Sequence, residues 1–263
     1  MKDLVRIAAE TRCEVIEMIN RAGSGHPGGS LSATDIMVYL FFKEMDQAKD
    51  RFILSKGHAA PVFYSILSRQ GKIPKGELQK LRTFGSICQG HPDTMFLPLV
   101  TVSSGSLGQG LSVANGLAIA LRSDGSGGRV YVIVGDGEIQ EGQIWEAAMT
   151  APRYKLDNVC LIVDYNGIQL DGFVKDIKPL EPLVAKWKAF GWNAIPADGH
   201  DFKSLRSAFN KAKNKKGMPS VIIAKTVKGK GVSFMENACD FHGKAPDKDQ
   251  TTCALGEIRG CLE

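Results

Sequence analysis

Two apolar segments of this chain each end in a short run of glycines or oxygen-bearing side chains. Residues 130–134 lead directly into Gly-Asp-Gly at 135–137, and residues 159–163 lead into Asp-Tyr-Asn at 164–166. A stretch with helical character separates them, so the unit is predicted to be strand, helix, strand. Ligands of open α/β sheets bind at the carboxyl ends of the strands, where both polar runs would lie. This pattern predicts an α/β fold with a ligand site at that edge.

The side chains in these two runs suit a metal ion that carries phosphate. Asp136 and Asn166 offer hard oxygen ligands of the kind that magnesium prefers. Gly135 and Gly137 allow a tight turn and a close approach of the backbone to a ligand. A helix expected to begin near Glu138 would direct its amino-terminal dipole to the same place. Asp-Gly and Asn-Gly also form ordinary turns, but their positions at two strand ends favour a metal-diphosphate site.

The alternation of strands and helices continues along the whole chain. Strands and helices are expected at these positions: strands 51–55, 129–134, 158–164, 193–197 and 219–225; helices 3–21, 59–70, 75–83, 108–121, 138–151, 180–190 and 201–213. A further helix, capped by Ser30 or Ser32, should run to about Phe42. The alternation predicts a mostly parallel sheet with helices on both faces, in one domain over 1–263. Residues 226–247 are expected to form a mobile loop over the site.

Composition and charge exclude several classes of protein. Hydrophobic residues make up 43% of the chain and charged residues 23%, as in soluble globular proteins. The net charge of +5 is mild, and the densest basic run, 211–216, fits a solvated helix end better than a nucleic-acid-binding face. The six cysteines form no Cys-x-x-Cys pair, and neither a signal peptide nor a membrane span is visible. These features predict a cytoplasmic protein with no nucleic-acid or membrane partner.

The motifs around the histidines resemble those of the transketolase family. Four histidines lie in such motifs: His26 in Gly-His-Pro-Gly-Gly-Ser, His58 in Ser-Lys-Gly-His-Ala, His91 in Gly-His-Pro-Asp and His242 in His-Gly-Lys-Ala-Pro. The Gly-Ser-Leu-Gly-Gln-Gly segment at 105–110 resembles that family too. The 30-residue spacing between Asp136 and Asn166 is similar to the thiamine diphosphate fingerprint. The resemblance covers about residues 4–250 and concerns only the amino-terminal, diphosphate-binding domain of a full transketolase.

The resemblance implies roles for the histidines. Three of them would face the sugar donor and its covalent adduct: His26, His91 and His242. His58 would lie near the diphosphate and the reactive carbon of the cofactor. Histidine suits these tasks because it exchanges protons near neutral pH and donates to sugar hydroxyls. His200, which follows a strand, is instead expected to be structural, with Asp201 capping the next helix.

The cofactor implied by the resemblance is thiamine diphosphate with magnesium, or alternatively calcium or manganese. The implied metal ligands are Asp136, Asn166 and the main-chain carbonyl of Ile168. The implied cofactor-binding residues are His58, Gly105, Ser106, Leu107, Gly135, Asp136, Gly137, Glu141, Asn166 and His242. Ser106 stands where transketolases often have proline, which changes loop stiffness without removing a chemical group. Glu141 and, more weakly, Glu146 match glutamates of a carboxylate link between the two active sites of transketolases.

The resemblance also implies a partner chain. In transketolases the glutamate that activates the aminopyrimidine lies on the pyrimidine-binding domain, which is expected on a separate chain together with the carboxyl-terminal domain. Residues 229–234, Gly-Lys-Gly-Val-Ser-Phe, resemble split transketolases more than single-chain forms. An α2β2 heterotetramer is expected, active only when both chains are present. It would transfer a two-carbon ketol unit from a ketose or ketose phosphate to an aldose or aldose phosphate.

Three other interpretations compete with this one. The chain could belong to another thiamine diphosphate enzyme, such as a 2-oxo acid dehydrogenase decarboxylase component or a deoxyxylulose-phosphate synthase, but these are not expected to share all the histidine motifs. A non-catalytic paralogue is disfavoured because the candidate metal ligands and loop histidines are all present. A plain nucleotide-binding domain is disfavoured because no Gly-x-Gly-x-x-Gly follows a first strand. The sugars stay open, between the pentose phosphate pathway and a dedicated catabolic route.

Overall fold

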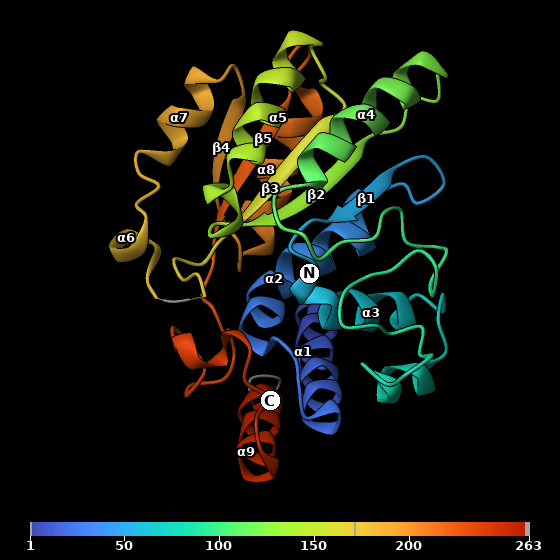
Figure 1. Ribbon diagram of the computed structural model, residues 1–263, viewed down its shortest axis with the longest axis vertical. Helices are drawn as coiled ribbons and strands as arrows, with labels where there is room; N and C mark the ends of the chain where they lie inside the picture. The colour runs from blue at the N-terminus through green and yellow to red at the C-terminus, as the bar shows by residue number, and fades with distance from the viewer. Residues whose placement is uncertain (1, 171, 261–263) are drawn as a thin grey trace.

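The core of the protein is a parallel β-sheet enclosed by helices (Figure 1). The computed structural model describes residues 2–170 and 172–260. The sheet has the order β1-β2-β3-β5-β4, and its strands are β1 (Arg51–Leu54), β2 (Val130–Gly135), β3 (Val159–Tyr165), β4 (Asn193–Asp198) and β5 (Ser220–Lys225). All neighbouring strands pair in parallel. The predicted α/β fold with a mostly parallel sheet is therefore confirmed.

The register of the sheet brings the polar strand ends together. Gly135 at the end of β2 pairs with Asp164 of β3, and Tyr165 pairs with Lys225 at the end of β5. Because the strands are parallel, the residues that follow each of them emerge at one edge of the sheet. That common edge is where ligands bind in open α/β sheets.

Helices cover both faces of the sheet (Figure 1). The α-helices of the described residues are α1 (Lys2–Ala22), α2 (Pro27–Tyr39), α3 (Ala60–Arg69), α4 (Gly110–Ser123), α5 (Gly142–Arg153), α6 (Val174–Ile177), α7 (Leu183–Ala189), α8 (Phe202–Asn214) and α9 (Lys248–Gly260). Alternate strand residues enter two cores: Tyr131 and Ile133 pack with α1, α2, α3 and α8, whereas Val132 and Val134 pack with α4, α5 and α7. Such sheets are buried on both faces, which explains the continuous apolar runs in the sequence.

The start of α2 differs from the prediction. Neither Ser30 nor Ser32 caps this helix, which begins at Pro27 with His26 in the N-cap position. Proline is favoured at the first helical position because its fixed φ suits the helix and its missing N–H is not needed there. Ser30 Oγ donates to the carbonyl of His26 at 2.9 Å, and Ser32 Oγ donates to Asp164 at 2.6 Å. Ser30 therefore forms a hydrogen bond at the start of its own helix, whereas Ser32 forms one with the sheet edge.

Other local predictions also need correction. The helix expected from Glu138 begins at Gly142, after a 3-10 turn over Glu138–Gln140. The helix expected at 75–83 is a 3-10 helix over Lys75–Lys80, and Arg82 follows it with a φ of +61°. Helix α9 was not predicted, because few of its residues are apolar. In the structure its Ala254 and Ile258 pack in the core with α1.

The segment 226–247, expected to be a mobile loop, is packed against the body of the protein. Its backbone is joined to α2 by a hydrogen bond from the N–H of Gly229 to the carbonyl of Gly28 at 3.0 Å. Val232 and Met235 are fully buried in the core that contains α1 and α2.

Across the ranges that the structure describes, no helix has the length and apolar character needed to cross a membrane.

Candidate active site

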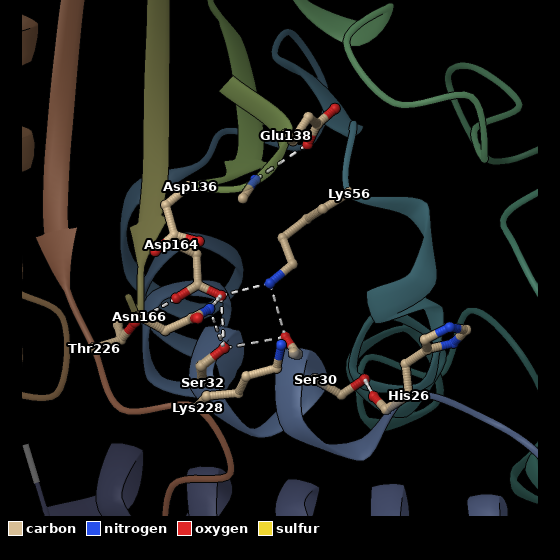
Figure 2. A network of polar contacts seen from close by, with 12 residues as sticks. His26, Ser30, Ser32, Lys56, Asp136, Glu138, Asp164, Asn166, Thr226 and Lys228 are labelled. Atoms are coloured by element: carbon tan, nitrogen blue, oxygen red, sulfur yellow. Dashed lines mark hydrogen bonds and ion pairs between the residues drawn. The ribbon is translucent and has the colours of Figure 1, made fainter. Parts of the chain in front are cut away.

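Polar side chains from four strand ends converge at the carboxyl edge of the sheet (Figure 2). These residues lie at the end of β1, β2, β3 or β5 or shortly after it. They are Lys56 after β1, Asp136 after β2, Asp164 and Asn166 at the end of β3, and Thr226 and Lys228 after β5. Helix α2 closes the site from one side with Ser32 (Figure 2). Polar side chains thus lie at the predicted edge of the sheet, but several of these residues were not identified from the sequence.

A buried ion pair forms the base of the site. Lys56 Nζ lies 2.5 Å from Asp164 Oδ2, with side chains that are only 1% and 0% exposed, and it also donates to the carbonyl of Gly29 at 3.0 Å. Ser32 and Thr226 donate hydroxyl hydrogen bonds to the same carboxylate. Burial acts to raise the pKa of Asp164, but the Lys56 ammonium and these hydrogen bonds outweigh it and hold the pKa below its ordinary value. The pair therefore anchors α2 to the sheet.

The three residues predicted as metal ligands lie together beside this pair. Asp136 Oδ2 accepts a 2.5 Å hydrogen bond from the N–H of Gly167, the residue between Asn166 and Ile168. Asn166 Oδ1 accepts from the N–H of Ile168 at 3.1 Å, which fixes the turn. Burial and the charge of Asp164 raise the pKa of Asp136 to about 7. Burial thus disfavours the ionised form of Asp136, and a bound cation would favour it.

A buried lysine supplies the opposite charge. Lys228 Nζ contacts the carbonyl of Ile168 at 3.2 Å and Nδ1 of His242 at 2.8 Å, and both acceptors are neutral. Burial and the nearby Lys56 lower the pKa of Lys228 to about 8. An ammonium in such a place gains stability from an anion. Asp136 and Lys228 together thus suit a cation and an anion bound side by side.

The donor set fits a magnesium-type ion only with help from a bound anion. Among residues 2–170 and 172–260, no group of three or more His, Cys, Asp or Glu side chains could hold a metal ion. Asp136, Asn166 and the Ile168 carbonyl would supply one carboxylate, one amide and one backbone oxygen. Magnesium commonly binds through one or two carboxylates plus phosphate oxygens and water. The residues present therefore fit a metal diphosphate.

Four histidines form a cluster next to this charged edge. The ring of His26 lies 5.4 Å from His58, 6.4 Å from His91 and 5.4 Å from His242, measured between ring centroids. His58 and His242 are 5.3 Å apart. The backbone at Gly57 passes close to this cluster, since a Cβ there would lie 2.5 Å from Ser104 Oγ and 3.2 Å from the ring of His91. The structure therefore brings together all four histidines that the sequence singled out.

The hydrogen bonds of two of these histidines define their tautomers. Arg82 Nη2 lies 3.2 Å from His26 Nδ1, and Lys228 Nζ lies 2.8 Å from His242 Nδ1. Guanidinium and ammonium groups only donate, so each Nδ1 accepts and each neutral ring carries its proton on Nε2. Burial, reinforced by the neighbouring cations, lowers the pKa of His26 to about 4 and that of His242 to about 3. Both rings are thus neutral Nε2–H donors at physiological pH.

The other predicted site residues lie at the rim. Gly105, with a φ of +143°, approaches the ring of His91, and Leu107 is exposed. Glu141 is the N-cap residue of α5, and both it and Glu146 are exposed. A carboxylate link needs a second active site, so it stays a prediction, as do the cofactor contacts of residues 105–107.

His200 has the structural surroundings that were expected. Its Nδ1 donates to Asp35 Oδ2 at 2.6 Å, and its Nε2 accepts from the N–H of Val227 at 2.9 Å. Asp201 caps α8 by accepting from the N–H groups of Lys203 and Ser204. Both nitrogens of His200 are therefore engaged within the fold.

Several residues of the site escape prediction from the sequence. They are Ser32, Lys56, Arg82, Glu138, Asp164, Thr226 and Lys228. Lys56 and Asp164 lie inside the histidine motif at 55–59 and the polar run at 164–166, so attention to charged residues in those segments would have found them. Arg82 and Lys228 carry no local signal, because their contacts are with residues in other parts of the chain.

The fold and site define a class of protein: a parallel α/β domain whose sheet carries, at its carboxyl edge, residues that fit a metal diphosphate beside a histidine cluster. Comparison with known families makes this specific. The family described as transketolase, thiamine diphosphate binding domain, matches residues 5–259. The chain belongs to this family.

Similar proteins occur in two lengths. A 6-deoxy-6-sulfo-D-fructose transketolase subunit from a Clostridium species is 39% identical, over 97% of this chain and 96% of that protein. An apulose-4-phosphate transketolase subunit from Actinobacillus succinogenes is 40% identical, over 93% of this chain and 91% of that protein. Human transketolase is 39% identical, but the match spans only 41% of its length. The crystal structure of transketolase from Campylobacter jejuni superposes with a TM-score of 0.91, at 30% identity, over 98% of this chain and 43% of that one.

Proposed function

We propose that this chain is the thiamine diphosphate-binding subunit of a two-chain transketolase. The observation that carries the proposal is the placement of a buried carboxylate, Asp136, and a buried lysine, Lys228, whose Nζ donates to neutral acceptors, at one sheet edge beside four clustered histidines. The enzyme would move a two-carbon ketol unit from a ketose or its phosphate to an aldose or its phosphate. When bound, thiamine diphosphate supplies the carbanion chemistry of this transfer.

Different residues of this chain would bind the metal diphosphate and the sugar. Asp136, Asn166 and the Ile168 carbonyl would hold a divalent ion, with magnesium as the first choice, and Lys228 would neutralise the diphosphate. His26 and His242 would donate from Nε2 to oxygen atoms of the sugar, because both rings are neutral and their Nδ1 atoms already accept hydrogen bonds. Fixed donors of this kind stabilise charge that develops on a substrate oxygen.

A partner subunit is part of the proposal. Relatives named as transketolase subunits match this chain over nearly their whole length, whereas it matches only 41% of human transketolase. Phe84, Met95 and Leu99, in the segment that also carries His91, are exposed apolar side chains. Exposed apolar side chains are often covered by partners. The partner would carry the pyrimidine-binding domain and its glutamate, in an α2β2 assembly.

The test is reconstitution with the natural partner. The tagged chain would be recovered from its own cells with thiamine diphosphate and magnesium, and the co-purified protein would be identified and produced separately. We expect ketol transfer, assayed with xylulose 5-phosphate and a panel of other ketoses, only when both chains are mixed. A complex that binds thiamine diphosphate but decarboxylates a 2-oxo acid instead would show that the chain serves a different thiamine enzyme. A complex that binds no thiamine diphosphate would refute the proposal.

A further inference from the structure

Glu138 is a buried carboxylate of the site to which no role has been assigned so far. Its side chain is 2% exposed and turns back toward the end of β2 (Figure 2). Oε1 accepts hydrogen bonds from Ser55 Oγ at 2.5 Å and from the N–H of Gly108 at 3.0 Å, and Oε2 accepts from the N–H of Gly135 at 3.1 Å. All of these groups donate, so the ionised carboxylate matches its surroundings.

The bonds of Glu138 join three segments that are distant in the sequence. Ser55 follows β1, Gly135 ends β2, and Gly108 belongs to the loop 105–110 that leads into α4. Ser55 Oγ also accepts from the N–H of Gly110 at 3.2 Å, so the loop is held at two amides. One glutamate and one serine therefore fix the backbone of residues 108–110 to the sheet.

The backbone of the loop passes very close to neighbouring residues. A Cβ on Gly110 would lie 2.4 Å from Ser55 Oγ, and a Cβ on Gly108 would lie 2.9 Å from the Cβ of Glu141. Gly108 also has a φ of +85°, which favours glycine. Close approach of the backbone is thus needed for both hydrogen bonds, and the glycines make that approach possible.

We propose that Glu138 and Ser55 form a clamp that positions residues 105–108 against the ring end of the bound cofactor. This inference rests on the proposed function, because the resemblance to transketolases implies that residues 105–107 bind the cofactor, at its aminopyrimidine ring. The side chains proposed to hold the diphosphate end are different ones: Asp136, Asn166 and Lys228. Glu138 is therefore a positioning residue that acts through Gly108. Because it also accepts from the N–H of Gly135 beside Asp136, its loss should weaken binding of the ring more than binding of the diphosphate.

The distinguishing experiment compares two ligands on the complex with the partner chain. Magnesium thiamine diphosphate and magnesium diphosphate alone would be titrated by calorimetry into wild type and E138Q. The glutamine keeps the size of the side chain, but its NH2 group must face one of the N–H donors. We expect thiamine diphosphate to bind about tenfold more weakly, as for a buried donor left unsatisfied, while diphosphate affinity changes less than about twofold. Amide exchange at residues 105–110 should become faster.

A second variant and a control keep the test decisive. S55A removes one hydroxyl and leaves the carboxylate, so it should fold and show the same split between the two ligands. E17Q, at an exposed position on α1, should bind both ligands like wild type. Equal loss of both ligands, or no loss of either, in E138Q and S55A would overturn the clamp. Wild type that binds diphosphate but not thiamine diphosphate would instead overturn the proposed function on which the clamp rests.

Discussion

At the scale of single residues, the site is organised around charges that are incomplete without a ligand. Lys56 and Asp164 compensate each other inside the protein. Asp136 and Lys228 form no ion pair with each other, and burial displaces their pKa values to about 7 and about 8, toward the neutral form of each group. Displaced pKa values of buried groups are often found at functional sites. They distinguish the residues proposed to bind ligand from those that hold the fold.

Removing the Asp136 carboxylate should abolish magnesium-dependent binding of thiamine diphosphate. We expect the affinity to fall by about 100-fold or more in D136A, because one of the few protein ligands of the metal is lost. Calorimetric titration of the complex in the presence and absence of magnesium measures this effect. D124A, at an exposed carboxylate after α4, is the control. Unchanged magnesium-dependent binding in D136A would remove Asp136 from the metal site.

His26 should matter for turnover and not for cofactor binding. H26A removes an Nε2–H donor from the cluster but leaves Asp136, Asn166 and Lys228 in place. Loss of one positioned proton donor commonly costs about 100-fold or more in rate. We expect kcat of the reconstituted enzyme to fall to that extent while the affinity for thiamine diphosphate stays within about threefold of wild type. Normal turnover in H26A would contradict a role toward the sugar.

At the scale of elements, helix α2 is the part that links the site to the rest of the fold. Its Ser32 binds Asp164 at the sheet edge. Its buried Asp35 binds Arg12 of α1 through both oxygens and also accepts from His200. Burial tends to raise the pKa of Asp35, but Arg12 and His200 hold it below its ordinary value. Buried charges therefore fix helix α2 both to the sheet and to α1.

Neutralising Asp35 should destabilise the protein strongly. D35N leaves the Arg12 guanidinium buried without a charged partner, which costs about 3–5 kcal/mol of unfolding free energy in comparable cases. Urea unfolding followed by circular dichroism measures the change. E17Q breaks the exposed pair between Glu17 and Arg259 and should cost less than about 1 kcal/mol. Equal, small effects of the two substitutions would show that the buried pair contributes no more than a surface pair.

At the scale of the whole molecule, the histidine cluster makes stability depend on pH. His26, His58, His91 and His242 all have a pKa below the ordinary value of 6.5, chiefly because they are buried. Between their folded and unfolded pKa values, these four histidines bind more protons in the unfolded state than in the folded state. Their contribution to stability is therefore greatest above about pH 6.5 and falls as the pH drops toward about 4.

The free energy of unfolding should accordingly be lower at about pH 5 than at about pH 7.5. Replacing one cluster histidine by asparagine, as in H26N, should reduce that fall by about 1–2 kcal/mol, since one titrating group is removed. Urea unfolding at both pH values, with wild type and variant in parallel, measures it. H200N, outside the cluster, is a control for general effects of losing a histidine. An identical pH dependence in H26N and wild type would show that the cluster does not control acid stability.

The sequence by itself determined the fold class, the edge of the sheet that carries the site, and two candidate metal ligands, Asp136 and Asn166. These follow from local patterns: apolar runs of strand length, the helices between them, and polar residues where two strands end. The same logic misplaced the cap of α2, because Ser30 and Ser32 are both good capping residues. Pro27 is the local signal that marks the earlier start of the helix.

Only the tertiary structure decided which charges are paired and which are left for a ligand. Lys56 and Asp164 are 108 positions apart, and Glu138 and Ser55 are 83 apart. Whether such groups meet depends on strand order and register, which the local periodicity of a chain does not encode. The histidines could be named from their motifs, but their neutral state and their Nε2 protons follow from Arg82 and Lys228, which fold in from elsewhere. The physical reason is that burial and pairing, and not residue type alone, set the charge of a buried group.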